Sequence, residues 1–266
     1  MKLAAFSLYW LGQAGFLIEA AGLRILVDPY LSDSLAQKYR GTETPHERMM
    51  PPPITPEALG HVDLVLCTHQ HTDHMDGETL TALARRLPAL QFLVPAAATA
   101  VALERTAASP GRLIAVDAGE VHELFGGRLR VHVMRAAHET LEKDAAGRHR
   151  FLGFGLEIGG RRIFHSGDTI PFPGQAEEIR AFAPDLMLLP VNGRSEALRA
   201  LGIAGNLTLA EAVELTAACG APAMLAHHFG MFAFNTADPR DIGLAAAAAP
   251  FQMIASAVQT AIEPVP

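Results

Sequence analysis

Short apolar runs alternate with longer amphipathic segments along most of this chain. The runs are rich in Val, Ile, Leu and Phe, and their length predicts β-strands rather than helices. They are "FLIEA" (16–20), "LRILVD" (23–28), "VDLVLCT" (62–68), "QFLVP" (91–95), "RLIAV" (112–116), "LRVHVMRAA" (129–137), "GFGLEI" (153–158), "RRIFHSG" (161–167), "DLMLLPV" (185–191) and "PAMLAHH" (222–228). Gly22 and the pair Gly159-Gly160 separate neighbouring runs and predict tight hairpin turns.

Helices are predicted between several of these runs. Apolar residues spaced along one helical face follow the third run and end at Pro88; they are Leu80, Leu83, Ala84 and Leu87. Thr208 and Glu211 have the spacing of a capping box ahead of a helix that ends at Gly220. Asp238-Pro239 predicts a further helix start. Strands with interspersed helices indicate an α/β or α+β fold of layered sheets, and without a linker or repeat we expect one domain over residues 1–266.

The longest irregular stretch runs from about residue 32 to residue 56 and carries "PPPITP". A loop of this length inside a compact domain is more often functional than incidental. We therefore predict a surface loop that walls a pocket.

Composition narrows the class of protein. Half of the 266 residues are apolar, and the formal net charge of -7 comes without a Lys/Arg run. This charge argues against nucleic-acid binding. Cys67 and Cys219 are the two cysteines and lie far apart in the sequence, so they form no disulfide framework and favour a reducing, cytoplasmic setting.

The first 22 residues, "MKLAAFSLYWLGQAGFLIEAAG", resemble a signal peptide at first sight. The leading part holds one charge, however, and Gly12, Gln13 and Gly15 interrupt the apolar run. We therefore expect paired strands here. Elsewhere no uninterrupted apolar run is long enough to span a bilayer, so no membrane association is predicted.

Four potential metal ligands follow the strand predicted over 62–68. His69, His71, Asp73 and His74 stand in the order His-x-His-x-Asp-His. Imidazole nitrogen and carboxylate oxygen are common ligands of zinc and similar divalent ions. One cation cannot easily use all four at this spacing, whereas two adjacent cations can share them. We interpret the cluster as a metal site and not as a polar loop with exposed histidines.

Further ligands are expected at the ends of other strands. His138 follows the run at 129–137, Asp168 follows "RRIFHSG", and His227 and His228 end the run at 222–228. Each of these residues is weak evidence alone. Together they recur at strand ends, where a layered sheet presents its functional groups.

These motifs, taken together, resemble the metallo-β-lactamase superfamily of hydrolases. "THQHTDH" matches the hallmark of that superfamily, and Asp28-Pro29, "AAH" and "HSGDT" match its other motifs in order and spacing along nearly the whole chain. Within the superfamily, "WLGQAGFLIE", "DPYLSD", "FHSGDT" and "HHFGMFAFNTADP" resemble the branch of the L-ascorbate-6-phosphate lactonase and related hydrolases.

The resemblance implies a four-layer αββα sandwich with a site for two divalent metal ions at one edge. By position, His69, His71 and His138 would hold the first ion. Asp73, His74 and a last histidine would hold the second, and Asp168 would bridge the two; these are the counterparts of the family's ligands in this sequence. The last ligand is expected at His228, ahead of an aromatic residue, with His227 as the alternative. Zinc is the expected metal, and manganese is compatible with the same ligands.

The expected activity is hydrolysis by a hydroxide shared between the two metals, which Asp73 orients before donating a proton to the leaving group. A small anionic ester or lactone is the expected substrate. A phosphodiesterase resembling N-acyl-phosphatidylethanolamine phospholipase D and a non-catalytic metal-binding sensor are the alternatives. A tRNA-processing endonuclease ranks lowest, because the chain is acidic. Association into homo-oligomers is compatible with the resemblance.

Four further residues are candidates for substrate binding. Arg194 and Asn206 lie near a strand end and a helix start, which are natural sites for an anion. His165 precedes the Asp168 motif, and His227 precedes His228. A solvated arginine and structural histidines are the alternative interpretations.

Overall fold

The structure, a computed structural model, describes residues 6–255 and 261–262. In these residues two seven-stranded sheets pack face to face. The first sheet has the order β14-β1-β2-β3-β4-β5-β6 and the second the order β13-β12-β11-β10-β9-β8-β7. Each sheet joins an antiparallel half, β1–β3 or β7–β10, to a parallel half, β3–β6 or β10–β13.

The strand bounds follow the apolar runs closely. The first sheet contains β1 (Ser7–Gly12), β2 (Gly15–Ala20), β3 (Leu23–Val27), β4 (Leu64–Leu66), β5 (Gln91–Pro95), β6 (Leu113–Val116) and β14 (Ala261–Ile262). The second contains β7 (Val121–Leu124), β8 (Leu129–Arg135), β9 (Leu152–Ile158), β10 (Arg161–His165), β11 (Leu186–Pro190), β12 (Ala223–His227) and β13 (Gln252–Ala255). Every predicted strand is present, and the predicted turns at Gly22 and Gly159-Gly160 join antiparallel neighbours.

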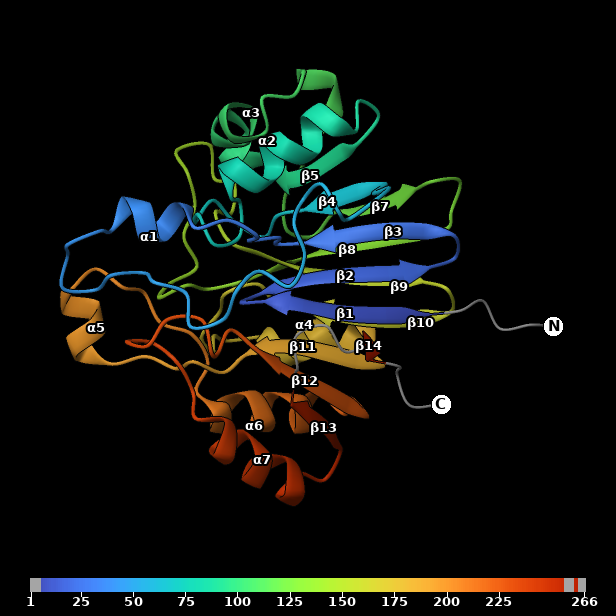
Figure 1. The fold of residues 1–266 in the computed structure, drawn as a ribbon. Helices are drawn as coiled ribbons and strands as arrows, with labels where there is room; N and C mark the ends of the chain where they lie inside the picture. The colour runs from blue at the N-terminus through green and yellow to red at the C-terminus, as the bar shows by residue number, and fades with distance from the viewer. Residues whose placement is uncertain (1–5, 256–260, 263–266) are drawn as a thin grey trace.

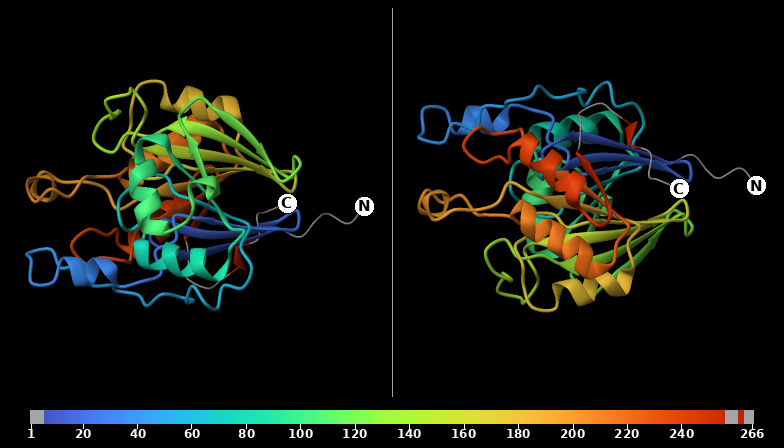
Figure 2. Two further views of the ribbon diagram at one scale, coloured as in Figure 1. Left: turned by 90° about the horizontal axis from the view of Figure 1, so that it is seen from above. Right: turned by 90° about the horizontal axis from the view of Figure 1, so that it is seen from below.

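Helices cover the outer face of each sheet, so the layers follow the predicted αββα order (Figures 1 and 2). α2 (Gly77–Arg86) and α3 (Thr99–Thr106) pack together beside β5 and β6. α4 (Gln175–Phe182), α6 (Leu209–Cys219) and α7 (Pro239–Ala248) lie against the second sheet. The 3₁₀ turns Ala96–Ala98 and Pro110–Arg112 flank α3.

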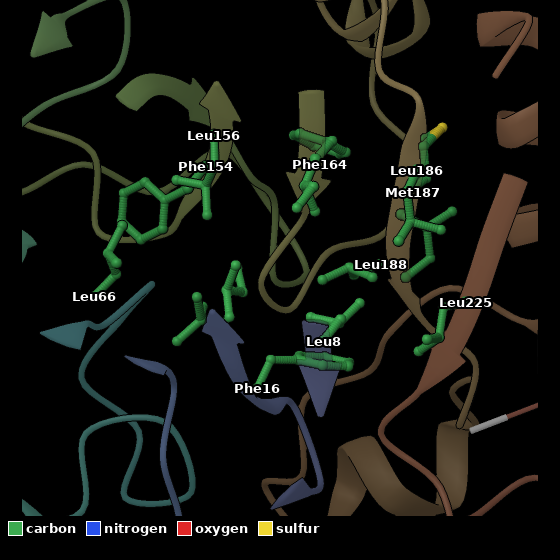
Figure 3. Packing of buried hydrophobic residues seen from close by; sticks show 14 of the residues in the cluster. Leu8, Phe16, Leu66, Phe154, Leu156, Phe164, Leu186, Met187, Leu188 and Leu225 are labelled. Carbon is green, nitrogen blue, oxygen red and sulfur yellow. The ribbon is translucent and has the colours of Figure 1, made fainter. Parts of the chain in front are cut away.

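Apolar side chains fill the space between the two sheets (Figure 3). Phe16 of the first sheet and Phe154 and Phe164 of the second are at most 1% exposed. A second apolar cluster lies between the first sheet and α2, where Phe92 and Leu83 are fully buried. The one-face spacing of α2 is thus explained by burial against this sheet.

Some elements were not predicted. β7 and β13 are short, and α3 and α4 lack a distinct start signal in the sequence, because neither helix has a side-chain cap. The irregular stretch contains the short helix α1 (Ser34–Lys38), and α5 (Glu196–Ala200) is equally short. Both project at the same end of the molecule, the left of each view in Figure 2.

Residues 7–20 form β1 and β2, as expected of paired strands, whereas Lys2 and the rest of 1–5 lie outside the described residues. Cys67 and Cys219 are both free and buried. In the part of the chain that the structure describes, no helix is long and apolar enough to cross a membrane.

Candidate metal centre

The chain segments that follow four strands converge at one end of the sandwich. β4 of the first sheet leads into the His-x-His-x-Asp-His segment, and β8, β10 and β12 of the second sheet lead to His138, Asp168 and His228. Three groups of these side chains have ligand atoms within 4.8 Å of one another: His69, His71 and His138; His69, His74 and Asp168; and Asp73, His74 and His228. The structure therefore brings together all seven side chains that the sequence analysis selected as metal ligands.

Asp168 lies between the other side chains. Its Oδ1 is 3.3 Å from His74 Nε2 and 3.3 Å from His228 Nε2, and its Oδ2 is 3.6 Å from His138 Nε2. The carboxylate thus has one oxygen near His74 and His228 and the other near His138.

Several polar atoms in the cluster make no hydrogen bond of good geometry among the described residues, although His74 Nε2 and Asp168 Oδ1 lie 3.3 Å apart. They are buried and include Nε2 of His69, Nε2 of His74 and Oδ1 of Asp168. An unpaired buried polar atom is costly, so a native structure rarely keeps one without a ligand. These orphaned atoms face one another, and their donor types fit a divalent cation of the zinc or manganese kind.

Asp28, directly after β3, holds the segment that follows β4. Its Oδ1 accepts the backbone N–H of Thr68 at 2.7 Å, and its Oδ2 accepts the Thr68 hydroxyl at 2.6 Å. The same Oδ2 lies 2.7 Å from Nδ1 of His74. A carboxylate there fixes the proton on Nδ1 and leaves Nε2 for a cation. The sequence analysis noted the Asp28-Pro29 motif but gave Asp28 no role.

Gln13 is the site residue that the sequence analysis missed. It lies in the turn between β1 and β2, where its backbone oxygen accepts the indole N–H of Trp10 and the backbone N–H of His228, both at 2.9 Å. Its side-chain nitrogen donates to Oδ2 of Asp73 at 2.8 Å and lies 3.1 Å from Nε2 of His228. A buried glutamine between two glycines, as in "GQAG", is the signal that could have identified it.

The backbone oxygen of Gly205 orients the His138 ring. Its Nδ1 lies 2.9 Å from the backbone oxygen of Gly205, so Nε2 faces the cluster. A Cβ on Gly205 would come within 2.1 Å of Cβ of Arg194, and a residue with a side chain therefore could not keep this backbone position.

Burial and three neighbouring carboxylates give His74 a different charge state from His69 and His71. Burial lowers the pKa of His71 to about 4 and holds the pKa of His69 well below its usual value. Burial also opposes the charging of His74, but Asp168, Asp73 and Asp28 outweigh it and raise the pKa of His74 well above 6.5. The first two imidazoles are thus neutral and ready to bind a cation, whereas His74 carries a proton until a cation displaces it.

Asp168 and Asp73 are ionised. Burial opposes the charged form of Asp168, but the neighbouring His228 and His74 hold its pKa well below the usual range. The same two histidines outweigh burial at Asp73 and lower its pKa.

Two of the candidates for substrate binding, Arg194 and Asn206, differ in how far their polar groups are already paired. Arg194 forms two contacts of 2.6 Å with the carboxylate of Glu211 and donates to the backbone oxygen of Asn206, so its charge is already paired. The pairing lowers the pKa of Glu211 to about 2. Asn206 is 1% exposed, and its Oδ1 has no hydrogen-bond partner among the described residues.

His165 and His227 lie beneath the cluster and not within it. Their rings stack with centroids 5.0 Å apart, and both rings contact the edge of Phe16. His165 is satisfied by the oxygen of Ala14 and the backbone N–H of Gly167. The geometry therefore places His228, and not His227, beside Asp73 and His74.

A cavity of about 410 Å³ opens onto the cluster. Its floor includes His71, Asp73, His138, Asp168 and His228, and Asn206 also lines it. Its walls come from the segments around α1 and from residues 201–204 and 232–235. The prediction that the irregular stretch 32–56 walls a pocket is confirmed.

The sequence and the fold of the chain are similar to those of known proteins. A model of the beta-lactamase superfamily domain matches residues 23–229. A UPF0173 metal-dependent hydrolase of Aeropyrum pernix is 29% identical over 247 residues, which cover 88% of this chain and 86% of that protein. An N-acyl-phosphatidylethanolamine-hydrolyzing phospholipase D 1 of Caenorhabditis elegans is 24% identical over 87% of this chain and 67% of that protein. The solved structure of an isothiocyanate hydrolase from Delia radicum gut bacteria superposes with a TM-score of 0.76 at 18% identity, covering 97% of this chain and 98% of that one, and shows the same fold.

Proposed function

Because the chain belongs to the metallo-β-lactamase superfamily and is a metal-dependent hydrolase, we propose that it hydrolyses small anionic esters or lactones. The observation that carries the proposal is the cluster of seven side chains with ligand atoms close together, which holds buried atoms without a hydrogen bond and reaches the floor of the cavity.

Two divalent cations fit the three groups of ligand atoms. His69, His71 and His138 would hold the first, and Asp73, His74 and His228 the second, with Asp168 shared between them. Zinc is favoured by the histidine share, and manganese is the alternative. When bound, such cations supply Lewis acidity, which lowers the pKa of water from 15.7 to about 7 and polarises the scissile carbonyl.

The residues of the chain then have defined tasks. Gln13 donates to one oxygen of Asp73 and holds that carboxylate in place. Asp73 is ionised, so it can accept a proton from the attacking water and return it to the leaving alkoxide. Asp28 fixes the proton of His74 on Nδ1, which keeps Nε2 directed at the cluster.

An anionic substrate is supported by the charges around the cavity. The carboxylates that line it are Asp73 and Asp168, and both belong to the metal cluster. With two divalent cations in place the floor would be positively charged, which attracts a carboxylate or phosphate. The lactonase-like branch rests on the motifs "DPYLSD" and "HHFGMFAFNTADP" and remains part of this proposal.

A phosphodiester is the second candidate substrate. The similarity to the phospholipase D of Caenorhabditis elegans favours it, since that protein is named for the hydrolysis of an N-acylated phospholipid. A protein that binds metal without turnover is the remaining alternative.

Metal content and hydrolysis, measured together, test the proposal. The protein is dialysed, loaded with zinc or manganese, and assayed on lactones, carboxylate-bearing esters and phosphodiesters, beside Asp73→Ala. We expect two metals per chain and turnover of one ester class that falls at least about a hundredfold in the variant, the effect of losing a general acid–base group. Turnover of phosphodiesters alone would select the second candidate. Stoichiometric metal with no turnover would favour the sensor, and no bound metal would overturn the assignment of the cluster.

A further inference from the structure

Four aromatic rings form one wall of the cavity beside the metal centre. They belong to Tyr39, His46, Phe232 and Phe234, all of which line the cavity. The His46 ring stacks on Tyr39 with centroids 4.1 Å apart and meets the rings of Phe232 and Phe234 edge-on at 4.9 and 4.8 Å. The two phenylalanine rings are parallel within 3° at 5.8 Å. We call these four residues the aromatic wall.

The aromatic wall joins two segments that are distant in sequence, and hydrogen bonds and ring contacts hold both in place. The backbone N–H of Met49 donates to the oxygen of Met231 at 2.8 Å. The side chain of Arg48 is 4% exposed and donates to the backbone oxygens of Tyr30 and Ser32. Tyr30 in turn contacts Phe232, with centroids 6.3 Å apart. The wall is therefore built before a substrate arrives, which lowers the entropy cost of binding.

His46 behaves as an apolar ring in this setting. Burial lowers its pKa, so the imidazole is neutral at pH 7. Its Nδ1 lies within hydrogen-bond distance, 2.7 Å, of the backbone oxygen of Thr44. The wall thus offers flat apolar surface rather than charge.

Lys38 supplies the charge at the edge of the wall. Its Nζ lies 5.0 Å from the centroid of Tyr39, and no carboxylate pairs with it among the described residues. Arg105, the other cation that lines the cavity, donates to the backbone oxygens of Gln70 and Met75. Lys38 is therefore the cation of this cavity that is free to meet an anionic substrate.

We propose that the aromatic wall and Lys38 form a specificity subsite for an aryl group that carries an anion, so that the preferred substrates are esters of aromatic acids whose ring bears a carboxylate or phosphate remote from the scissile bond. This inference rests on the proposed function, because the metal centre on the cavity floor would attack the ester end. Parallel and edge-on rings pack best against another ring, whereas an alkyl chain gains only from buried area. A cation beside the rings adds selection for the anion.

Matched compounds separate the two parts of the subsite. Monomethyl terephthalate carries an aryl group and an anion, monomethyl adipate an alkyl chain and an anion, and methyl benzoate an aryl group alone. All three release methanol, so proton release reports hydrolysis on one scale. The corresponding unreactive amides are terephthalic acid monoamide, adipic acid monoamide and benzamide, and calorimetry on the metal-loaded protein measures their binding without turnover.

We expect the terephthalate pair to bind and react best. Phe234→Leu should weaken the terephthalate compounds about three- to tenfold, chiefly in Kd and KM, with adipate changed less than twofold. Lys38→Met should weaken both anionic compounds and leave the benzoate pair unchanged. Phe125→Leu and Lys143→Met, which lie outside the cavity, serve as matched controls.

The outcomes distinguish the subsite from the activity. Adipate monoamide binding as tightly as terephthalate monoamide, or Phe234→Leu weakening all three amides equally, would overturn the subsite even if the esters react. A preference for terephthalate monoamide that Phe234→Leu reduces, together with weaker binding of both anionic amides in Lys38→Met, would support the subsite even if no ester were hydrolysed. In that case the proposed activity alone would fail.

Discussion

Three buried residues that orient the cluster have left-handed backbone conformations, although none is glycine. Gln13, Asp28 and His228 have φ values of 51°, 44° and 61°. Each such residue costs about 1–2 kcal/mol relative to ordinary backbone. All three make contacts at the metal centre, so the fold bears this strain where it positions ligands and their supporting residues.

Asp28→Asn should prevent His74 from binding a cation, and because asparagine has nearly the size of aspartate it should leave no cavity beside the His74 ring. An asparagine amide facing Nδ1 would favour the tautomer with the proton on Nε2, where a cation must bind. We expect metal affinity to fall about 10- to 100-fold, measured by competition with a fluorescent chelator. Asp33→Asn, at an exposed carboxylate near α1, should leave the affinity unchanged. Equal affinity in Asp28→Asn and the native protein would contradict the role of Asp28.

Metal binding should release a proton from the ligand group that contains His74 and not from the group that contains His69 and His71. His69 and His71 are neutral at pH 7, because burial keeps their pKa values low, to about 4 for His71. The pKa of His74 is raised by three carboxylates, so at pH 7 its proton must leave before a cation can bind. Apparent affinity at the His74 group should therefore rise as the pH increases toward the raised pKa.

Calorimetric titration with zinc in buffers of different ionisation enthalpy measures this release. We expect about one proton for the ion bound at the His74 group and close to none for the other above about pH 5. Lowering the pH through about 4 should weaken the His69 group as well, because His71 then binds protons. Equal proton release by both ions would contradict this division.

At the scale of elements, each ligand lies just beyond the end of a strand, and the following turn decides where it points. Asp168 follows β10 through Gly167, which has a φ of 60°. A Cβ at Gly167 would lie 2.7 Å from the backbone oxygen of Leu152 and 2.8 Å from Cβ of Thr68. Thr68 itself carries the hydrogen bonds to Asp28, so this contact links the segments after β4 and β10.

Gly167→Ala should therefore destabilise the protein and displace Asp168. The left-handed conformation alone costs an alanine about 1–2 kcal/mol, and the clash with backbone adds to it. Urea unfolding measures the change, and chelator competition measures the expected loss of metal. Gly243→Ala in α7 is the matched control, because no atom outside the nearby backbone of its own helix lies within 4 Å of its Cβ position. Helix propensity predicts a gain of about 0.5–1 kcal/mol there. Unchanged stability in Gly167→Ala would contradict the close packing at this turn.

At the scale of the molecule, the candidate metal centre connects the two sheets. His69, His71, Asp73 and His74 follow a strand of the first sheet, and His138, Asp168 and His228 follow strands of the second. A cation bound to ligands from both sheets exists only in the folded state, so its binding free energy adds to stability.

Metal loading should raise the unfolding temperature. A cation at a hundred times its Kd contributes about 2.7 kcal/mol. For a chain of this size that corresponds to about 5–10 °C, measured by scanning calorimetry with zinc and after chelation. Asp168→Ala should lose most of the shift, whereas His61→Ala, at an exposed histidine, should retain it. The same shift in Asp168→Ala would argue that the metal binds elsewhere.

Local pattern alone determined a large part of this protein. Strands and helices follow from periodicity and capping, because the residues that mark each element lie close together in sequence. The pairing of the strands is different, since it joins distant segments such as Ile25 and Leu64. The four candidate ligands between His69 and His74 were evident because they too lie close together in sequence. His138, Asp168 and His228 were weak candidates at strand ends, and the likeness to a known superfamily gave them their roles as ligands. The capping box at Thr208 and Glu211 is present as predicted.

The contacts between segments that are distant in sequence were decided by the tertiary structure. The hydrogen bond of Gln13 to Asp73 spans 60 positions, the contact of Asp28 with His74 spans 46, and the aromatic wall joins residues 39–46 to 232–234. The sequence suggested that Arg194 could bind a substrate, whereas in the fold its guanidinium is paired with Glu211. Such contacts depend on how two sheets pack and on which loops meet at their edge. Chain periodicity does not encode that arrangement, because the same alternation of apolar residues fits many ways of bringing strand ends together.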